Sequence, residues 1–335
     1  MTNHSTSASG QQMTGTIAIL LLCRFLRLIC STMPFSTNYL LGTLAAAAFQ
    51  TLLLLPLMLK PVFQLRSPIW RWGYALFALV AASHLLSRIY ALLQNLQAAY
   101  PMASVILCIA AAAYGLTLSK QATGRAAILL LGILAAGLLM QILSALPHAN
   151  PLLLYTPNTA YQDGDAFAEG FLQGAELALL PLCCLSYANA VQKRRSLMGK
   201  WLIGQLTLTL PVILLGILHN SRLLHWKGNP FFLLLARTQM FQAVHSDGFW
   251  QLLLMACSVV CVTFFLQIIW SPLPESHPTP ILSLLTGALL FGVTILFIMG
   301  NPPMIYQILV ILLFGFVIPL IFFRSDKRSA ERNST

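Results

Sequence analysis

Ten separate apolar stretches, each about as long as a bilayer is thick, constrain this chain more than any other feature. A helix needs about 20 apolar residues to cross the hydrocarbon layer, and it satisfies its own backbone hydrogen bonds there. The sequence therefore predicts an all-α polytopic membrane protein with ten transmembrane helices. The predicted spans are residues 14–33, 38–59, 70–95, 99–119, 126–146, 166–190, 198–219, 248–270, 279–299 and 303–323.

The composition excludes a soluble globular protein. Of the 335 residues, 58% are apolar and only 8% are charged, whereas soluble domains carry roughly a quarter charged residues. Because the spans and their connections use almost the whole chain, we expect a single transmembrane domain over residues 1–335. Its last part, 324–335, is a polar tail.

The basic residues predict the orientation of the helices. Lys and Arg total 19 against 8 acids, an excess that in a soluble domain would suggest nucleic acid. Here most of them lie in short connections, where they mark the cytoplasmic side, so no nucleic-acid partner is expected. With both termini in the cytoplasm, the inner connections hold 13 basic residues and the outer ones hold 3, in the segments 60–71, 120–125, 193–200 and 324–332 against 222–237.

Several kinds of site are not expected. All seven Cys lie inside apolar runs, where small buried side chains are the usual interpretation, and no metal-ligand or catalytic motif such as HExxH occurs. We therefore expect no metal, no cofactor and no enzymatic activity. Residues 1–14 contain no Lys or Arg, so the first apolar run is expected to be a retained helix rather than a cleaved signal peptide.

Two arginines lie inside the first span. Arg24 and Arg27 are three residues apart and share a helix face, which Ser31 and Thr32 continue. Arg27 is close enough to the span's end to extend to the headgroups. Arg24 is near mid-membrane, where an ionised group needs a partner, a cavity or a ligand.

The sixth span carries carboxylates along one stripe. Asp165, Glu169, Gln173 and Glu176 follow at spacings of four, four and three, which place them on one helix face. Glu176 follows Gly174 and precedes Pro181. This pattern favours a discontinuous helix with a carboxylate at the break, as transporters use for substrates, although a plain kinked helix is the alternative.

The third span contains a further polar face. His84 and Arg88 are four residues apart, with Ser83 and Ser87 beside them, so this stripe is expected to face a cavity. Simple packing of His84 and an exit of Arg88 to the outer headgroups are the alternatives.

These charges suggest a ligand site. If spans one and six are neighbours, Glu176 would offset Arg24 and leave the positive charge of Arg27 for a ligand carboxylate. A small zwitterion could then place its amine near Glu176. The predicted ligand-binding residues are Arg24, Arg27, Ser31, Thr32, His84, Arg88, Gly174 and Glu176.

The long outer connection, residues 220–247, has a helical pattern of about fourteen residues, too short to span a bilayer. It predicts either a surface helix that covers the extracellular mouth or a helix that rests in the headgroups.

Three short stretches carry a family resemblance. Gln173-Gly174-Ala175-Glu176-Leu177 is similar to a Pro-Phe-Gly-Glu turn, Gln192-Lys193-Arg194-Arg195 is a basic inner loop, and Asn229-Pro230-Phe231 with Ala236-Arg237 precedes an acidic helix start at Asp247. In these features and in layout the chain resembles the endospore germination permease family, the B subunits of germinant receptors, within the amino acid–polyamine–organocation superfamily.

The resemblance implies a LeuT-like five-plus-five inverted repeat with broken helices 1 and 6. It further implies a subunit in the bacterial cell or spore inner membrane that works with germinant receptor A and C subunits. Such a subunit would bind a small amino-acid-like ligand and trigger germination. A secondary amino-acid transporter, or a structural subunit without a ligand site, is the alternative.

Overall fold

The computed structural model describes most of the apolar part of the chain. The described residues are 3–31, 35–59, 68–95, 100–145, 163–177, 194–218, 247–270, 279–300 and 304–313. Within these ranges the chain is almost entirely α-helical and forms no strand. The prediction of an all-α protein is therefore confirmed for the described part.

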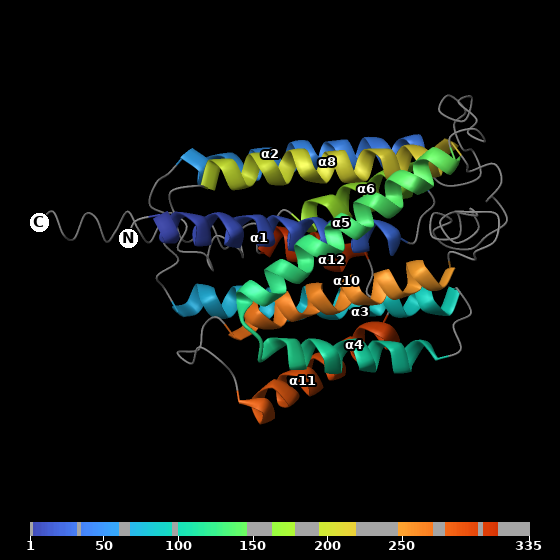
Figure 1. Ribbon diagram of the computed structural model, residues 1–335. Helices are drawn as coiled ribbons and strands as arrows, with labels where there is room; N and C mark the ends of the chain where they lie inside the picture. The colour runs from blue at the N-terminus through green and yellow to red at the C-terminus, as the bar shows by residue number, and fades with distance from the viewer. Residues whose placement is uncertain are drawn as a thin grey trace, which may run out of the picture.

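Each predicted span overlaps a helix of the structure (Figure 1), and the predicted spans 166–190 and 303–323 are described only as far as residues 177 and 313. The helices are α1 (Asn3–Ile29), α2 (Thr37–Leu59), α3 (Pro68–Asn95), α4 (Pro101–Leu116), α5 (Lys120–Ala145), α6 (Asp163–Leu177), α8 (Arg194–Leu218), α10 (Asp247–Trp270), α11 (Pro280–Gly300) and α12 (Met304–Ile311). The predicted surface helix within 220–247 lies outside the described residues.

Within the described ranges, five helices are long and apolar enough to cross a membrane. They contain the segments Trp72–Asn95, Lys120–Ser144, Gly199–Leu218, Gly248–Trp270 and Pro280–Gly300. Length and composition together make these helices suited to the hydrocarbon layer.

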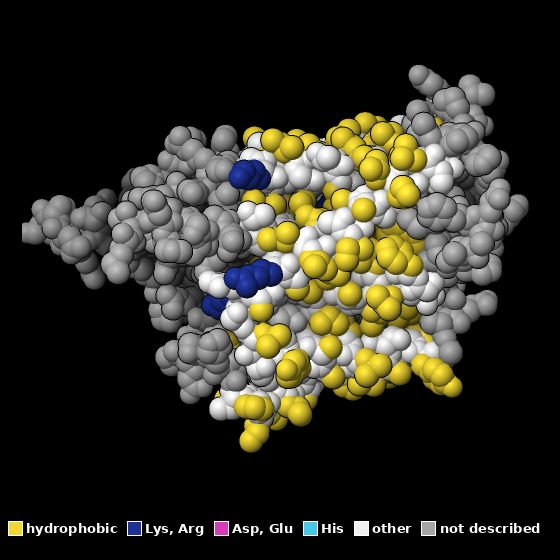
Figure 2. All heavy atoms as spheres, in the orientation of Figure 1, with side chains coloured by type: hydrophobic (Ala, Val, Ile, Leu, Met, Phe, Trp, Pro, Cys, Tyr) yellow, Lys and Arg dark blue, Asp and Glu magenta, His cyan; other side chains and the backbone are white. Residues whose placement is uncertain are grey.

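The outer surface of the bundle is apolar, as expected for contact with lipid. Figure 2 shows side chains of hydrophobic type over most of the visible face, with the few visible Lys and Arg toward one end. Large apolar side chains are exposed on many helices, among them Leu52, Leu76, Leu107, Leu129, Leu252, Ile281 and Leu284. A water-soluble protein rarely exposes apolar surface so continuously, so the chain is an integral membrane protein.

Helix α1 occupies the interior of this bundle. It packs against α5, α8, α10 and α6, and nearly every described side chain from Ala18 to Ser31 is buried. This position explains why Arg24 and Arg27 are buried at 2% and 5% exposure, although a span with two arginines could equally have faced headgroups or water.

Helices α2 and α6 form the most extensive helix pair in the structure. Gly42 and Ala46 on α2, and Gly170 and Gly174 on α6, are each spaced by four residues and face the other helix: Gly42 meets the backbone of Phe167, and Ala46 meets Gly174. A Cβ at Gly170 would lie 2.5 Å from the carbonyl oxygen of Tyr39, and a Cβ at Gly174 would contact Ala46. Small residues at this spacing let membrane helices approach closely, which brings the polar side of α6 against α2 and α1.

Candidate functional site

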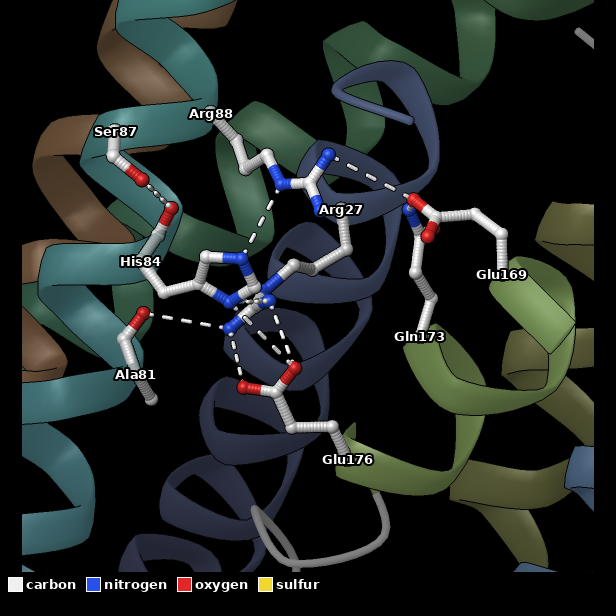
Figure 3. Close-up of polar contacts among 8 residues, drawn as sticks. All are labelled: Arg27, Ala81, His84, Ser87, Arg88, Glu169, Gln173 and Glu176. Atoms are coloured by element: carbon white, nitrogen blue, oxygen red, sulfur yellow. Dashed lines mark hydrogen bonds and ion pairs between the residues drawn. The ribbon is translucent and has the colours of Figure 1, made fainter. Parts of the chain in front are cut away.

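A bidentate ion pair joins α1 to α6 at the centre of the bundle (Figure 3). Arg27 donates from Nη2 to Oε1 of Glu176 at 2.9 Å and from Nη1 to Oε2 at 3.0 Å. Both side chains are buried, at 6% and 2% exposure. The predicted proximity of spans one and six is therefore confirmed.

The pairing differs from the sequence-based hypothesis, which matched Glu176 with Arg24. Arg24 and Arg27 share a helix face, but they lie almost one turn apart along α1. Glu176 stands at the height of Arg27, so both carboxylate oxygens are occupied there. Among the described residues, Arg24 rather than Arg27 is therefore the arginine of α1 without a carboxylate partner.

His84 on α3 lies between two guanidinium groups. Its Nδ1 is 2.9 Å from Nη1 of Arg27, and Arg88 donates from Nε to its Nε2 at 3.2 Å. Arg27 also donates to the carbonyl oxygen of Ala81 at 3.4 Å. A neutral imidazole has one acceptor nitrogen and an imidazolium has none, so protonation of His84 would set a further positive charge against two guanidinium groups.

A second branch of the network runs along α6 to α2. Arg88 lies 3.8 Å from Oε1 of Glu169, which also accepts a 2.7 Å hydrogen bond from Gln173. The amide oxygen of Gln173 accepts from the Tyr39 hydroxyl at 2.9 Å. Three of the predicted stripe residues on α6 thus face the interior, whereas the fourth, Asp165 in the first turn, is exposed.

Two buried glutamines extend the network to α8, and sequence reasoning missed them. Gln205 donates to the side-chain oxygen of Gln50 at 2.5 Å, and Gln50 donates to the carbonyl oxygen of Gly174 at 2.5 Å. Gly174, predicted to bind a ligand, therefore supplies a backbone acceptor and a close helix contact. An amide alone in an apolar span is the signal that could have identified both glutamines.

Arg24 has a different environment from Arg27. It is 2% exposed, and its Nε and Nη1 have no hydrogen-bond partner. Its Nη2 lies 3.8 Å from the position that a Cβ on Gly174 would occupy. The guanidinium thus points into the α1–α6 contact next to Ala46, and no described carboxylate pairs with it.

The remaining predicted site residues lie at the end of α1. Helix α1 is continuous past both arginines and ends at Ile29, and the chain leaves helical geometry at Cys30 and the buried Ser31. The described part of helix 1 therefore has no internal break: the chain leaves the helix only after Ile29, and the next helix, α2, begins at Thr37. Thr32 and the predicted break beyond Glu176 lie outside the described residues.

The described cluster carries one more positive than negative charge. Arg24, Arg27 and Arg88 supply three positive charges, and Glu169 and Glu176 supply two negative ones, of which Glu176 pairs with Arg27 and Glu169 with Arg88. Within the described ranges, no group of His, Cys, Asp and Glu has the geometry of a metal site. The arrangement can therefore hold an anion, and it ties three helices together through buried charges.

Comparisons with known proteins identify no relative. No family model, no curated protein and no solved structure matches the chain.

Proposed function

We propose that this chain is the membrane subunit of a nutrient receptor, of the kind that triggers spore germination. Its ligand would be a small nutrient such as an amino acid, bound at the polar cluster of α1, α3 and α6. The proposal draws on ten apolar helices, on the basic inner connections and on the resemblance to germination permeases. It includes ten crossings in a five-plus-five arrangement with both termini in the cytoplasm.

One observation carries the proposal: the Arg27–Glu176 ion pair and its neighbours are buried inside an otherwise apolar bundle. Ionisable groups at membrane depth are costly, and they usually mark a ligand or ion pathway. A protein that only needed stable packing would gain as much from apolar side chains at these positions.

The ion pair suggests how a ligand could act on the helices. Arg27 holds α6 and, through His84 and Ala81, also contacts α3. A ligand that competes for these donors would loosen α1 from α6 and permit rocking of one helix group against another. In a receptor this motion would pass to A and C subunits in the cell or spore inner membrane.

A ligand screen tests the proposal. The full chain in lipid nanodiscs is heated with each of the common amino acids, and the unfolding midpoint is recorded. A shift that wild type shows and Glu176→Gln loses supports a ligand site at the cluster. Arg125→Gln, which alters an exposed arginine on α5, is the matched control and should keep the shift.

Uptake into liposomes separates the alternatives. Binding without accumulation of labelled ligand supports a receptor subunit, whereas accumulation against a gradient would show a secondary transporter. If no amino acid or related nutrient shifts the midpoint, the proposal fails in favour of a structural subunit.

A further inference from the structure

Arg24 is a buried charge that the ion-pair network does not use. Nε and Nη1 carry most of the five guanidinium N–H donors, and neither nitrogen has a hydrogen-bond partner. Burying an ion without its counter-charge is costly in free energy. Within the described part of the chain, Arg24 is thus a buried positive charge without a counter-charge.

Among the described residues, no carboxylate pairs with Arg24. The chain has 8 acids in total. Both oxygens of Glu176 bind Arg27, and Glu169 faces Gln173 and Arg88. The other described acids, Asp163, Asp165 and Asp247, lie in the first turns of α6 and α10.

A second unpartnered polar group lies along the neighbouring α2–α6 contact. Thr43 is 2% exposed, its hydroxyl has no hydrogen-bond partner, and its backbone nitrogen is 3.3 Å from the Cβ position of Gly170. Ala46, one turn further along α2, meets Gly174, beside which the Arg24 guanidinium lies. The Arg24 guanidinium and the Thr43 hydroxyl therefore both lie beside the contact that the small residues form between α2 and α6.

We propose that Arg24 is the anion-binding element of this protein and that its ligand is a small monovalent anion without an ammonium group. The guanidinium supplies the charge and several donors. Because both buried carboxylates of the cluster already have cationic partners, the described residues offer no counter-charge to an amine. A short monocarboxylate fits this environment better than the corresponding amino acid.

This inference rests on the proposed function only in placing the ligand at the same cluster, and it narrows the class of ligand. Propionate and alanine form a matched pair of probes, because they differ by one ammonium group. Propionamide removes the charge while it keeps the size. Chloride tests whether any small anion suffices.

The experiment measures the unfolding midpoint of the full chain in nanodiscs, in HEPES buffer at constant ionic strength. Wild type should gain about 2–4 °C at saturating propionate, and less or nothing with alanine and propionamide. Arg24→Gln should abolish the gain, whereas Arg125→Gln should keep it. Arg24→Lys, which retains a cation, should keep a weaker gain.

The outcomes separate this inference from the proposed function. A chloride shift that Arg24→Gln removes also supports the anion site, with an inorganic anion as its occupant. A larger shift with alanine than with propionate overturns the inference and leaves the receptor proposal intact. The absence of any shift with propionate and chloride, or a propionate shift that survives in a folded Arg24→Gln variant, overturns the anion site.

Discussion

Removal of the Glu176 carboxylate should strongly destabilise the bundle. Glu176→Gln keeps the shape of the side chain but leaves Arg27 buried without a counter-charge. With N···O distances of 2.9 and 3.0 Å, the charge centres are about 4 Å apart, and an effective dielectric constant of about 20 gives an attraction of about 4 kcal/mol. Breaking a buried pair typically costs about 3–5 kcal/mol, so we expect a loss in this range.

The measurement is the free energy of unfolding in mixed micelles, with tryptophan fluorescence as the signal. The double variant Arg27→Met/Glu176→Met removes both charges and should recover most of the loss, because neither member of the pair is then buried without the other. Arg125→Gln, at an exposed position, should change the free energy of unfolding by less than about 0.5 kcal/mol.

The cost of Glu176→Gln alone decides whether the Arg27–Glu176 pair is shielded from water. If Glu176→Gln costs less than about 1 kcal/mol, the magnitude of an exposed ion pair, then water reaches the pair. The argument that these charges are sealed between α1 and α6 would then be wrong.

Three further variants test other parts of the structure by the same unfolding measurement. Gly170→Ala should cost about 1–3 kcal/mol, because its Cβ would stand 2.5 Å from a backbone oxygen. Gly132→Ala, with no atom within 4 Å of its Cβ position, should be neutral or slightly stabilising. Equal effects of the two substitutions would contradict the close α2–α6 packing. Gln50→Leu should cost about 1–3 kcal/mol, since it leaves the Gly174 carbonyl and the Gln205 amide without their partner. The double variant Gln50→Leu/Gln205→Leu should recover part of the lost free energy of unfolding. A larger loss in the double variant would refute the hydrogen-bonded chain of amides. Arg88→Gln should cost about 1 kcal/mol or less, because its side chain is 21% exposed and 3.8 Å from Glu169. A cost equal to that of Glu176→Gln would show that the Arg88–Glu169 pair contributes as much stability as the buried Arg27–Glu176 pair, despite its greater exposure.

The helices and the neighbours of the site could be predicted from the sequence. Apolar runs of membrane length located every described helix, because burial in lipid requires both the length and the composition. The rarity of charges in these runs pointed to the first, third and sixth spans. The structure brings Arg27, His84 and Glu176 from these spans into direct contact.

The partner of Glu176 could not be predicted in the same way. Spacing along α1 shows that Arg24 and Arg27 share a face, but the choice between them depends on how far α6 is shifted along its axis. That shift is determined by the α2–α6 contact, where Gly42 and Ala46 on α2 and Gly170 and Gly174 on α6 permit a close approach of the two helices. The two small-residue pairs are visible in the sequence, yet which helices they join depends on the tertiary fold.

The network of uncharged polar groups was also missed, for a related reason. Gln50 and Gln205 carry no charge, so the reasoning that a buried charge needs a partner did not reach them. A buried amide is subject to the same requirement, since its unmet hydrogen bonds also cost free energy.

The seam of small residues between α2 and α6 has a mechanical consequence. Separating two helices whose backbones approach this closely would give up the van der Waals contacts that their small residues permit. Helices α2 and α6 should therefore move as one rigid unit that carries Glu176, and any motion of this unit must either carry α1 along through the Arg27 ion pair or break that pair.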